Sequence, residues 1–196
     1  MFQNNKHSIF EKTKANTYMS NRLLIVFILQ FFFAQAKSQL GVMKLVGNNT
    51  KQYSIGFGAF IKTGFPLSEA ADLTVELGAN FFPVKGSGFN YGTAMCPVKA
   101  GYRYTLNQTG TGFYAEPQLG FNVYGVTSLE GASGETINVK YHGVVLAAGG
   151  GYLFSLGNTP FDVNLRYETT IANGGSNNMI SLGISRFFSF GSRNNN

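Results

Sequence analysis

The sequence has no tryptophan, a single cysteine and few charged residues. Charged side chains make up 12% of its 196 residues, about half of the roughly 25% in an average soluble domain. So small an ionic surface counts against an ordinary cytosolic protein. Cys96 alone cannot form a disulfide within the chain, and it lies too far from the N-terminal region to carry a lipid anchor there.

A basic stretch that would bind nucleic acid is also missing. The net charge is +6, but Lys6, Lys12, Lys14 and Arg22 against Glu11 place +3 of it before residue 37, and the other basic residues are scattered. A nucleic-acid surface needs clustered lysine and arginine, often interleaved with aromatic residues. The sequence therefore predicts no nucleic-acid partner.

An apolar run near the N-terminus has the layout of a secretory signal peptide. Residues 19–38 contain Arg22, then about 11 apolar positions from Leu23 to Phe33, then small residues. This run is too short for a transmembrane helix, which needs roughly 20 residues. A cationic start, a short apolar run and a small-residue end are typical of a cleavable signal. We therefore expect export from the cytoplasm.

Two cleavage sites fit this signal. For a cut after Ala36, the third residue before the cut is Ala34 and the last is Ala36. For a cut after Ser38, these residues are Ala36 and Ser38. Small residues are required at both positions. Met19 opens a complete signal peptide by itself, so a start there would leave residues 1–18 as an untranslated upstream extension.

After the signal, alternation of apolar and polar residues replaces any helical period. In FDVNLRYE, residues 161–168, the apolar and the polar side chains occupy opposite sides of an extended chain, because successive side chains of a strand point to opposite faces. Similar runs lie at 53–65, 71–81, 92–106, 112–126, 137–154 and 178–190, with a weaker one at 40–47. The sequence therefore predicts eight strands.

The lengths of these runs and of their connections favour a membrane barrel. Most runs span 11 to 18 residues, whereas globular strands cluster near 5 or 6 and membrane strands need about 9 to 11. Tight turns alternate with longer connections, as in outer-membrane barrels: the turns are 66–70, 107–110 and 157–160, and the longer connections are 85–90, 128–136 and 173–178. Only a closed sheet leaves no unpaired edge in hydrocarbon. The predicted fold is an all-β, eight-stranded antiparallel up-and-down transmembrane barrel.

Two prolines stand inside predicted strands. Pro97 and Pro117 each remove a hydrogen bond from the sheet, which is unusual away from edges and bulges. If their strands form a hairpin around the 107–110 turn, the two prolines lie at a similar distance from that turn. We therefore expect one β-bulge to accommodate both.

The polar face of these strands predicts a charged interior. Eight strands enclose a space just wide enough for side chains to fill, and charges kept from water need partners. Four cations and five anions face inward in this prediction, so the interior nearly neutralises itself. A solid polar plug is the favoured interpretation, and a narrow ion path is the alternative. The predicted network is Lys62, Asp72, Glu76, Lys99, Arg103, Glu116, Asp162, Arg166 and Glu168.

Aromatic residues near the predicted strand ends are expected on the apolar outer face, where membrane proteins carry aromatic girdles. The glycines at 149–151 lack the spacing of a phosphate loop and are expected either to relieve crowding or to permit curvature of the strand. The predicted girdle residues are Tyr53, Phe81, Phe113, Tyr141, Phe161, Phe188 and Phe190.

Residues that carry catalysis are scarce. A membrane-embedded hydrolase needs a histidine with a serine or with paired carboxylates. His142 is the only histidine after the signal, and Glu130 and Glu135 precede it. A structural histidine in the lumen or at its rim is the favoured alternative. No cluster has metal-ligand spacing, so the sequence predicts no enzyme, no catalytic residue, no metal and no cofactor.

Three segments carry a family resemblance. PVKAGYRY (97–104), FYAEPQLGF (113–121) and a last alternating strand that ends at Phe190, together with the signal peptide and the eight alternating runs, resemble the outer membrane protein beta-barrel domain family of Gram-negative bacteria. Its small OmpX/OmpA-like members are the most similar in architecture. The resemblance implies an outer-membrane location, contact with its lipid, and recognition of the final strand by the barrel-assembly machinery. It brings no catalytic residues.

These observations divide the chain into a signal region (1–38), a barrel (39–190) and a polar tail (191–196). The expected function is a non-enzymatic structural or surface-interaction role through the extracellular loops, chiefly 128–136. Two alternatives stay open. One is a narrow outer-membrane pore. The other is a secreted, lipocalin-like soluble barrel for an apolar ligand, which would place Phe161 and Leu165 inside.

Overall fold

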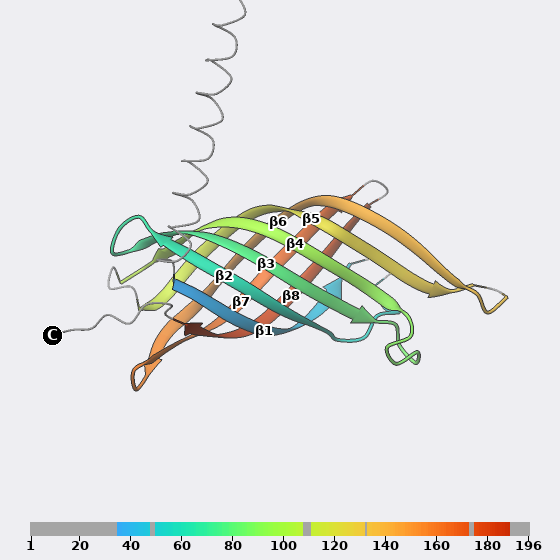
Figure 1. Cartoon of the computed structure of the whole chain (residues 1–196), viewed down its shortest axis with the longest axis horizontal. Coiled ribbons are helices and arrows are strands. Elements are labelled where there is room, and N and C mark those ends of the chain that lie inside the picture. Colours follow the sequence, from blue (N-terminus) through green and yellow to red (C-terminus); the bar gives the residue numbers. More distant parts are fainter. Residues whose placement is uncertain (1–34, 48–49, 108–110, 132, 173–174, 189–196) are drawn as a thin grey trace, which may run out of the picture. The chain divides into compact units, whose positions relative to one another are not determined.

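The computed structural model describes residues 35–47, 50–107, 111–131, 133–172 and 175–188. The predicted signal region before residue 35, Phe190 and the tail 191–196 lie outside them. The described residues form eight strands (Figure 1): β1 (Gln35–Val46), β2 (Gly56–Pro66), β3 (Ala71–Pro83), β4 (Gly92–Thr105), β5 (Gly112–Glu130), β6 (Thr136–Leu156), β7 (Thr159–Ala172) and β8 (Gly175–Phe188).

The strands form one closed antiparallel barrel in chain order. Each strand pairs with the next, and β1 closes the barrel by pairing with β8, for example through Leu40 opposite Ile184. Closure gives every strand two neighbours and satisfies the backbone groups within the wall. The predicted fold class is confirmed. In the described residues, no helix is long and apolar enough to cross a membrane.

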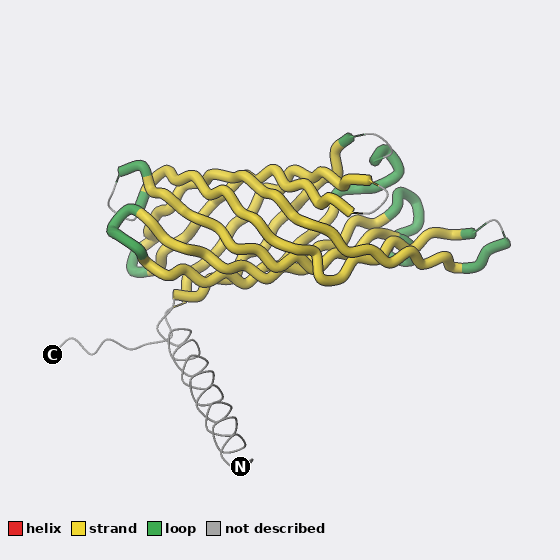
Figure 2. The backbone as a smooth tube through the Cα atoms, turned by 90° about the horizontal axis from the view of Figure 1, so that it is seen from above, coloured by secondary structure: helices red, strands yellow, loops and turns green. Residues whose placement is uncertain are grey.

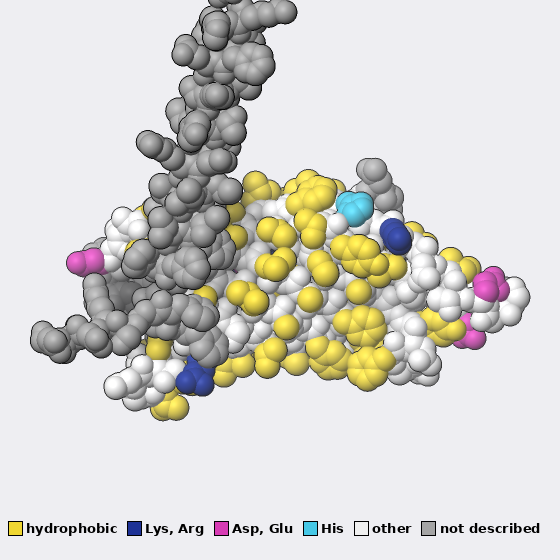
Figure 3. All heavy atoms as spheres, in the orientation of Figure 1, with side chains coloured by type: hydrophobic (Ala, Val, Ile, Leu, Met, Phe, Trp, Pro, Cys, Tyr) yellow, Lys and Arg dark blue, Asp and Glu magenta, His cyan; other side chains and the backbone are white. Residues whose placement is uncertain are grey.

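The two faces of the wall have opposite polarity. Leu77 and Leu165 are 53% and 58% exposed on the outer face, whereas Glu76 and Arg166 are 0% and 5% exposed and point inward. On the face that Figure 3 shows, hydrophobic side chains cover the middle of the wall and charged ones lie toward its ends. The lipocalin-like alternative is therefore wrong, since Leu165 does not point into the barrel.

The two ends of the barrel differ. The turn end carries the β2–β3, β4–β5 and β6–β7 connections, together with the start of β1 and the end of β8. The loop end carries the other connections and a β5–β6 hairpin that extends beyond the barrel (Figure 2). The predicted loops 128–136 and 173–178 are shorter than expected, because strand pairing continues to Glu130 opposite Thr136 and to Ala172 opposite Gly175.

The prolines are accommodated separately. The register of β4 against β5 shifts between Cys96 and Pro97, so a bulge lies at this proline, as predicted. Pro117 pairs in register with Ala148, so the expectation of one shared bulge is wrong. A second shift lies between Asn122 and Gly125 on β5.

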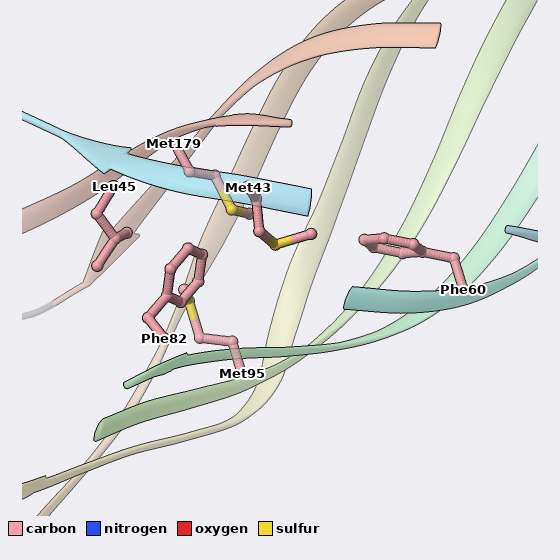
Figure 4. Close-up of a cluster of buried hydrophobic side chains, with 6 residues drawn as sticks. All are labelled: Met43, Leu45, Phe60, Phe82, Met95 and Met179. Atoms are coloured by element: carbon pink, nitrogen blue, oxygen red, sulfur yellow. The ribbon is translucent and has the colours of Figure 1, made fainter. Parts of the chain in front are cut away.

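The loop half of the interior holds an apolar cluster. Its six buried side chains come from β1, β2, β3, β4 and β8 and are Met43, Leu45, Phe60, Phe82, Met95 and Met179 (Figure 4). Tyr53 and Tyr141 pack against this cluster. The predicted outer girdle is therefore wrong for these two residues, because the apolar residues at the loop end line the interior. Phe113 does lie exposed on the outer face.

Candidate functional site

The turn half of the interior brings eight of the nine predicted lumenal charges together. All eight are buried, and they come from β2, β3, β4, β5 and β7. The exception is Asp72, which is half-buried and makes no ion pair within 4.0 Å of a described residue. The strand alternation therefore brings these charges to one inner surface, and closure brings them into contact.

Glu76 on β3 is the first of three anionic centres in this network. One carboxylate oxygen lies 2.8 Å from Lys62 Nζ, and the other lies 2.9 Å from Lys99 Nζ. Arg166 donates two hydrogen bonds, of 2.7 and 3.0 Å, to the same carboxylate. This bidentate geometry is the strong form of a charge-assisted bond. Lys99 also pairs with Glu168, which links β3, β4 and β7.

Glu116 on β5 is the second centre. Lys62 donates to one oxygen at 2.8 Å, and Arg103 donates two bonds, of 3.0 and 3.2 Å, to the other. Thr74 and Gln118 add hydrogen bonds of 2.7 and 2.9 Å. Lys62 therefore bridges Glu116 and Glu76, and each carboxylate has its lone pairs satisfied, as a buried charge requires.

Asp162 on β7 is the third centre, and its main partner is a residue that the sequence analysis missed. Lys37 on β1 forms a buried ion pair with Asp162. Tyr114 and Ser185 donate further bonds of 2.8 and 3.2 Å, and Arg103 lies at 4.0 Å. The sequence analysis places Lys37 in the signal region and therefore predicts no inward position for it. The alternation of Lys37 with its neighbours would have revealed it.

Glycines on β6 leave space for this network. A Cβ atom at Gly151 would lie 2.5 Å from the Val163 carbonyl oxygen on β7 and 2.7 Å from the Tyr114 hydroxyl. One at Gly149 would lie 2.9 Å from the Leu165 carbonyl oxygen and 3.2 Å from Arg166 Cβ. Real Cβ contacts are rarely so short, so both positions relieve crowding, as predicted. Phe60 then covers the network on its loop side, with Lys99 Nζ 5.4 Å and Arg166 Cζ 5.6 Å from the ring centroid. Such distances permit cation–π attraction.

The possible catalytic site does not assemble. His142, Glu130 and Glu135 are all exposed. Glu130 pairs with Thr136, six residues before His142 on β6, or roughly 20 Å at the rise of a strand. Within the described ranges, no group of three histidine, cysteine or carboxylate side chains is placed to hold a metal.

The β5–β6 hairpin presents an unpaired strand edge at the loop end. β6 pairs with β5 from Thr136 onward, but its pairing with β7 begins only at Gly143. Residues 136–142 therefore have a neighbour on one side and no described strand on the other. The opposite edge of the hairpin is covered by β4 as far as Ser128. An open edge offers backbone N–H and C=O groups to another chain.

Comparison with known proteins identifies this architecture. No family model and no curated protein matches the chain. Among solved structures, the attachment invasion locus protein Ail of Yersinia pestis matches with a TM-score of 0.57 and 12% identity, over 79% of this chain and 97% of Ail. The N-terminal barrel of Pseudomonas aeruginosa OprF matches with a TM-score of 0.53 and 14% identity, over 79% and 99%. The chain has the fold of an outer-membrane β-barrel.

This fold is that of the small OmpX/OmpA-like outer-membrane barrels of Gram-negative bacteria. Neisserial surface protein A is a further similar structure, with a TM-score of 0.50 and 14% identity over 79% of this chain and 97% of its own. Identities this low establish the fold and no more. What the barrel binds must be argued from its own residues.

Proposed function

We propose that this protein is a non-enzymatic outer-membrane barrel that binds a partner protein at the cell surface by strand addition. The observation that carries the proposal is the unpaired edge of β6 at residues 136–142, beyond the barrel wall. Adding a strand to an open edge is a common mode of peptide recognition, in which backbone bonds give affinity and alternate side chains give specificity.

The side chains along this edge favour a particular kind of partner. Ile137, Val139 and Tyr141 share one face of the hairpin with the inward residues of β6, and Asn138, Lys140 and His142 share the other. Opposite charges on adjacent strands attract. We therefore expect an extended segment that alternates β-branched residues with acidic ones.

The orientation of the barrel supports a surface role. Outer-membrane barrels keep their short turns in the periplasm and their longer loops outside, which puts the hairpin outside the cell. Two barrels of the same fold are named as an attachment protein and a surface protein. Insertion would follow recognition of the last strand by the barrel-assembly machinery, through the predicted signal that ends at Phe190, outside the described residues.

The ion network suits a structural role for the lumen. Paired charges from six strands, β1 included, hold the turn half of the barrel together, and Phe60 covers them on the loop side. We therefore favour the plug over the pore. In planar lipid bilayers the purified barrel should give no large, steady channels, and such channels would refute the filled lumen.

Shortening the hairpin tests the proposed function. Thr127 pairs directly with Val139, so residues 128–138 can be replaced by an Asn-Gly turn, which suits a two-residue hairpin. The probe is a peptide of alternating threonine and glutamate, added to the barrel in lipid nanodiscs. Hydrogen exchange should show protection of residues 136–142 in the full chain, and the shortened barrel, which keeps only residues 139–142 of this edge, should bind the peptide more weakly.

The same experiment has a built-in control. The amides of β5 near Gln118, which pair within the wall on both sides, should be unaffected by the peptide. Folded barrels change their electrophoretic mobility when they are boiled in detergent. If the shortened barrel still shows this change, it is folded. If the shortened barrel binds the peptide as well as the full chain does, the hairpin edge is not the binding element.

A further inference from the structure

The loop end of the lumen contains a cavity of about 680 Å³, here called the vestibule. Its lining includes Leu45, Tyr53, Thr127, Tyr141, Asn177 and Asn178, from β1, the β1–β2 loop, β5, β6 and β8. Leu45 also belongs to the apolar cluster of Figure 4, so this cluster forms part of the floor. The volume falls within the ~300–1,000 Å³ typical of small-molecule sites.

The lining of the vestibule is polar but uncharged. Amide and hydroxyl side chains alternate with tyrosine and aliphatic ones, and none of the described lining residues carries a charge. A charged ligand would lose hydration there without gaining a counter-charge. A purely apolar ligand would leave the amides and hydroxyls without partners. The lining therefore favours a neutral ligand that has both apolar faces and many hydroxyl groups.

The tyrosines of the vestibule are held in position by the barrel. A Cβ atom at Gly125 would lie 2.6 Å from the Tyr141 ring, so this glycine lets the ring lie close over β5. Thr93 lies within hydrogen-bond distance of the Tyr53 hydroxyl, at 3.3 Å, and of the Thr127 hydroxyl, at 2.9 Å. Rigid aromatic rings offer contact area at little entropic cost.

We propose that the vestibule binds an uncharged carbohydrate. The C–H face of a sugar ring packs on the Tyr53 and Tyr141 rings, and the sugar hydroxyls bond to the amide of Asn177. Because the vestibule opens at the loop end, the sugar comes from outside the cell. This site shares Val139 and Tyr141 with the unpaired edge of β6, but it uses their side chains, whereas strand addition uses the backbone groups of the edge. Its lining residues Thr127 and Val139 remain in the shortened hairpin.

Titration followed by NMR tests this site. The probes are maltotriose and N,N′-diacetylchitobiose, added to isotope-labelled barrel in lipid nanodiscs. We expect saturable shifts at Tyr53, Tyr141 and Asn177 with at least one of these sugars. Tyr141→Leu should weaken that binding roughly tenfold, the effect of losing one aromatic contact. The matched control is Tyr152→Leu on the outer face of the same strand, which should leave binding unchanged.

Each other outcome would overturn the carbohydrate proposal. Shifts that do not saturate, or that survive Tyr141→Leu at full affinity, would show that the sugars do not use the vestibule. Tighter binding of a sulfated disaccharide at the same residues would contradict an uncharged ligand. Shifts with soluble short-chain lipid but with neither sugar would assign the cavity to an acyl chain. The shortened hairpin should bind the sugar as the full chain does, so this test is independent of the proposed function.

A second inference concerns maturation and depends on the expected signal peptide. Lys37 is buried, pairs with Asp162 and lies with its Nζ 5.0 Å from the Phe187 ring centroid. Without Lys37, Asp162 would keep two hydroxyl donors and an arginine at 4.0 Å. Removing one partner of a buried ion pair is strongly destabilising. The folded barrel therefore needs Lys37.

We infer that the signal peptide is cut after Ala36 and not after Ser38. Water hydrolyses the Ala36–Lys37 peptide bond, which leaves a carboxylate on Ala36 and a free α-amine on Lys37. β1 then begins at Lys37 and keeps its pairing with β8 through Val46. A cut after Ser38 would remove Lys37 and leave Asp162 without its main partner.

The mass and N-terminal sequence of the exported protein test this inference. The mature chain should begin at Lys37, and a start at Gln39 would overturn it. Ala34→Leu blocks only the Ala36 site and should prevent processing or yield an unstable barrel that begins at Gln39. Ser38→Leu blocks only the alternative site and should leave the mature N-terminus at Lys37.

Discussion

The two halves of the lumen are built from the same strands but from different chemistry. On β1 the inward residues change from Lys37 at the turn end to Met43 and Leu45 toward the loop end. On β4 they change from Arg103 and Lys99 to Met95. The turn half is filled by paired charges, whereas the loop half has an apolar cluster beneath an open vestibule.

This difference shows that inward polarity is not a fixed property of such a barrel. Buried charges must be matched by partners in defined positions, so the turn half is closed and specific. Flexible thioethers fill irregular space without such demands, so the methionines of the loop half can pack beside a cavity. We infer that the first half sets the shape and the second leaves room for a ligand.

Removal of the Glu76 carboxylate should have the largest effect on this arrangement. Glu76→Gln leaves Lys62, Lys99 and Arg166 with one fewer buried anion, at an expected cost of about 3–5 kcal/mol. Urea unfolding in lipid vesicles measures this free energy. Asp72→Asn is the matched control, because Asp72 is half-buried and outside the network. Equal losses for the two variants would contradict an ionic turn half.

Truncation in the loop half should cost less. Met95→Ala empties part of the apolar cluster and should lower the free energy of unfolding by about 2–3 kcal/mol, the low end for buried methionine, because the cluster borders an open cavity. Met95→Leu nearly conserves volume and should cost under about 1.5 kcal/mol. If Met95→Ala costs more than Glu76→Gln, the division of roles between the halves is reversed.

Overpacking of the turn half should have a similar or smaller effect. Gly151→Ala places a Cβ atom 2.5 Å from the Val163 carbonyl oxygen and 2.7 Å from the Tyr114 hydroxyl, and it should cost about 1–3 kcal/mol. The control is Gly64→Ala, where the nearest atom would be 3.9 Å away. Thermal unfolding of both variants would show whether Gly151 is required for space. If Gly151→Ala and Gly64→Ala are equally stable, Gly151 is not required to leave space.

The smallest effect is expected in the hairpin. Glu130→Gln changes an exposed charge at the tip, far from both halves of the lumen, and should change the free energy of unfolding by no more than about 0.5 kcal/mol. A larger loss would show that the hairpin supports the barrel and is more than an exposed appendage.

Much of the fold was predictable because a barrel wall imposes a period of two along each strand. That period predicts that Leu165 points outward and Arg166 inward, and the number of alternating runs predicts the number of strands. It could not give the ion pairs, since closure decides which inward charges meet. Lys37 was missed for a different reason, because a signal peptide and a first strand overlap in sequence.

The loop end was less predictable. There the interior itself is apolar, so the hydrophobic pattern of Val139 and Tyr141 marks the inner face, whereas that of Val144 and Leu146 marks the outer one. The apolar residues change from one face of β6 to the other at Gly143, which is also where the pairing of β6 with β7 ends. Alternation alone cannot say which solvent each face meets. The vestibule also depends on how separate loops come together, which no local pattern records.

The most direct test of the account uses the absence of tryptophan from the chain. A single tryptophan at Leu165 should be quenched strongly by lipids with brominated acyl chains and little by aqueous iodide, whereas one at Ile137 on the hairpin should show the reverse. This result would establish that the apolar face of the wall contacts lipid and that the hairpin lies in water. Quenching of the Leu165→Trp variant by iodide alone would contradict it.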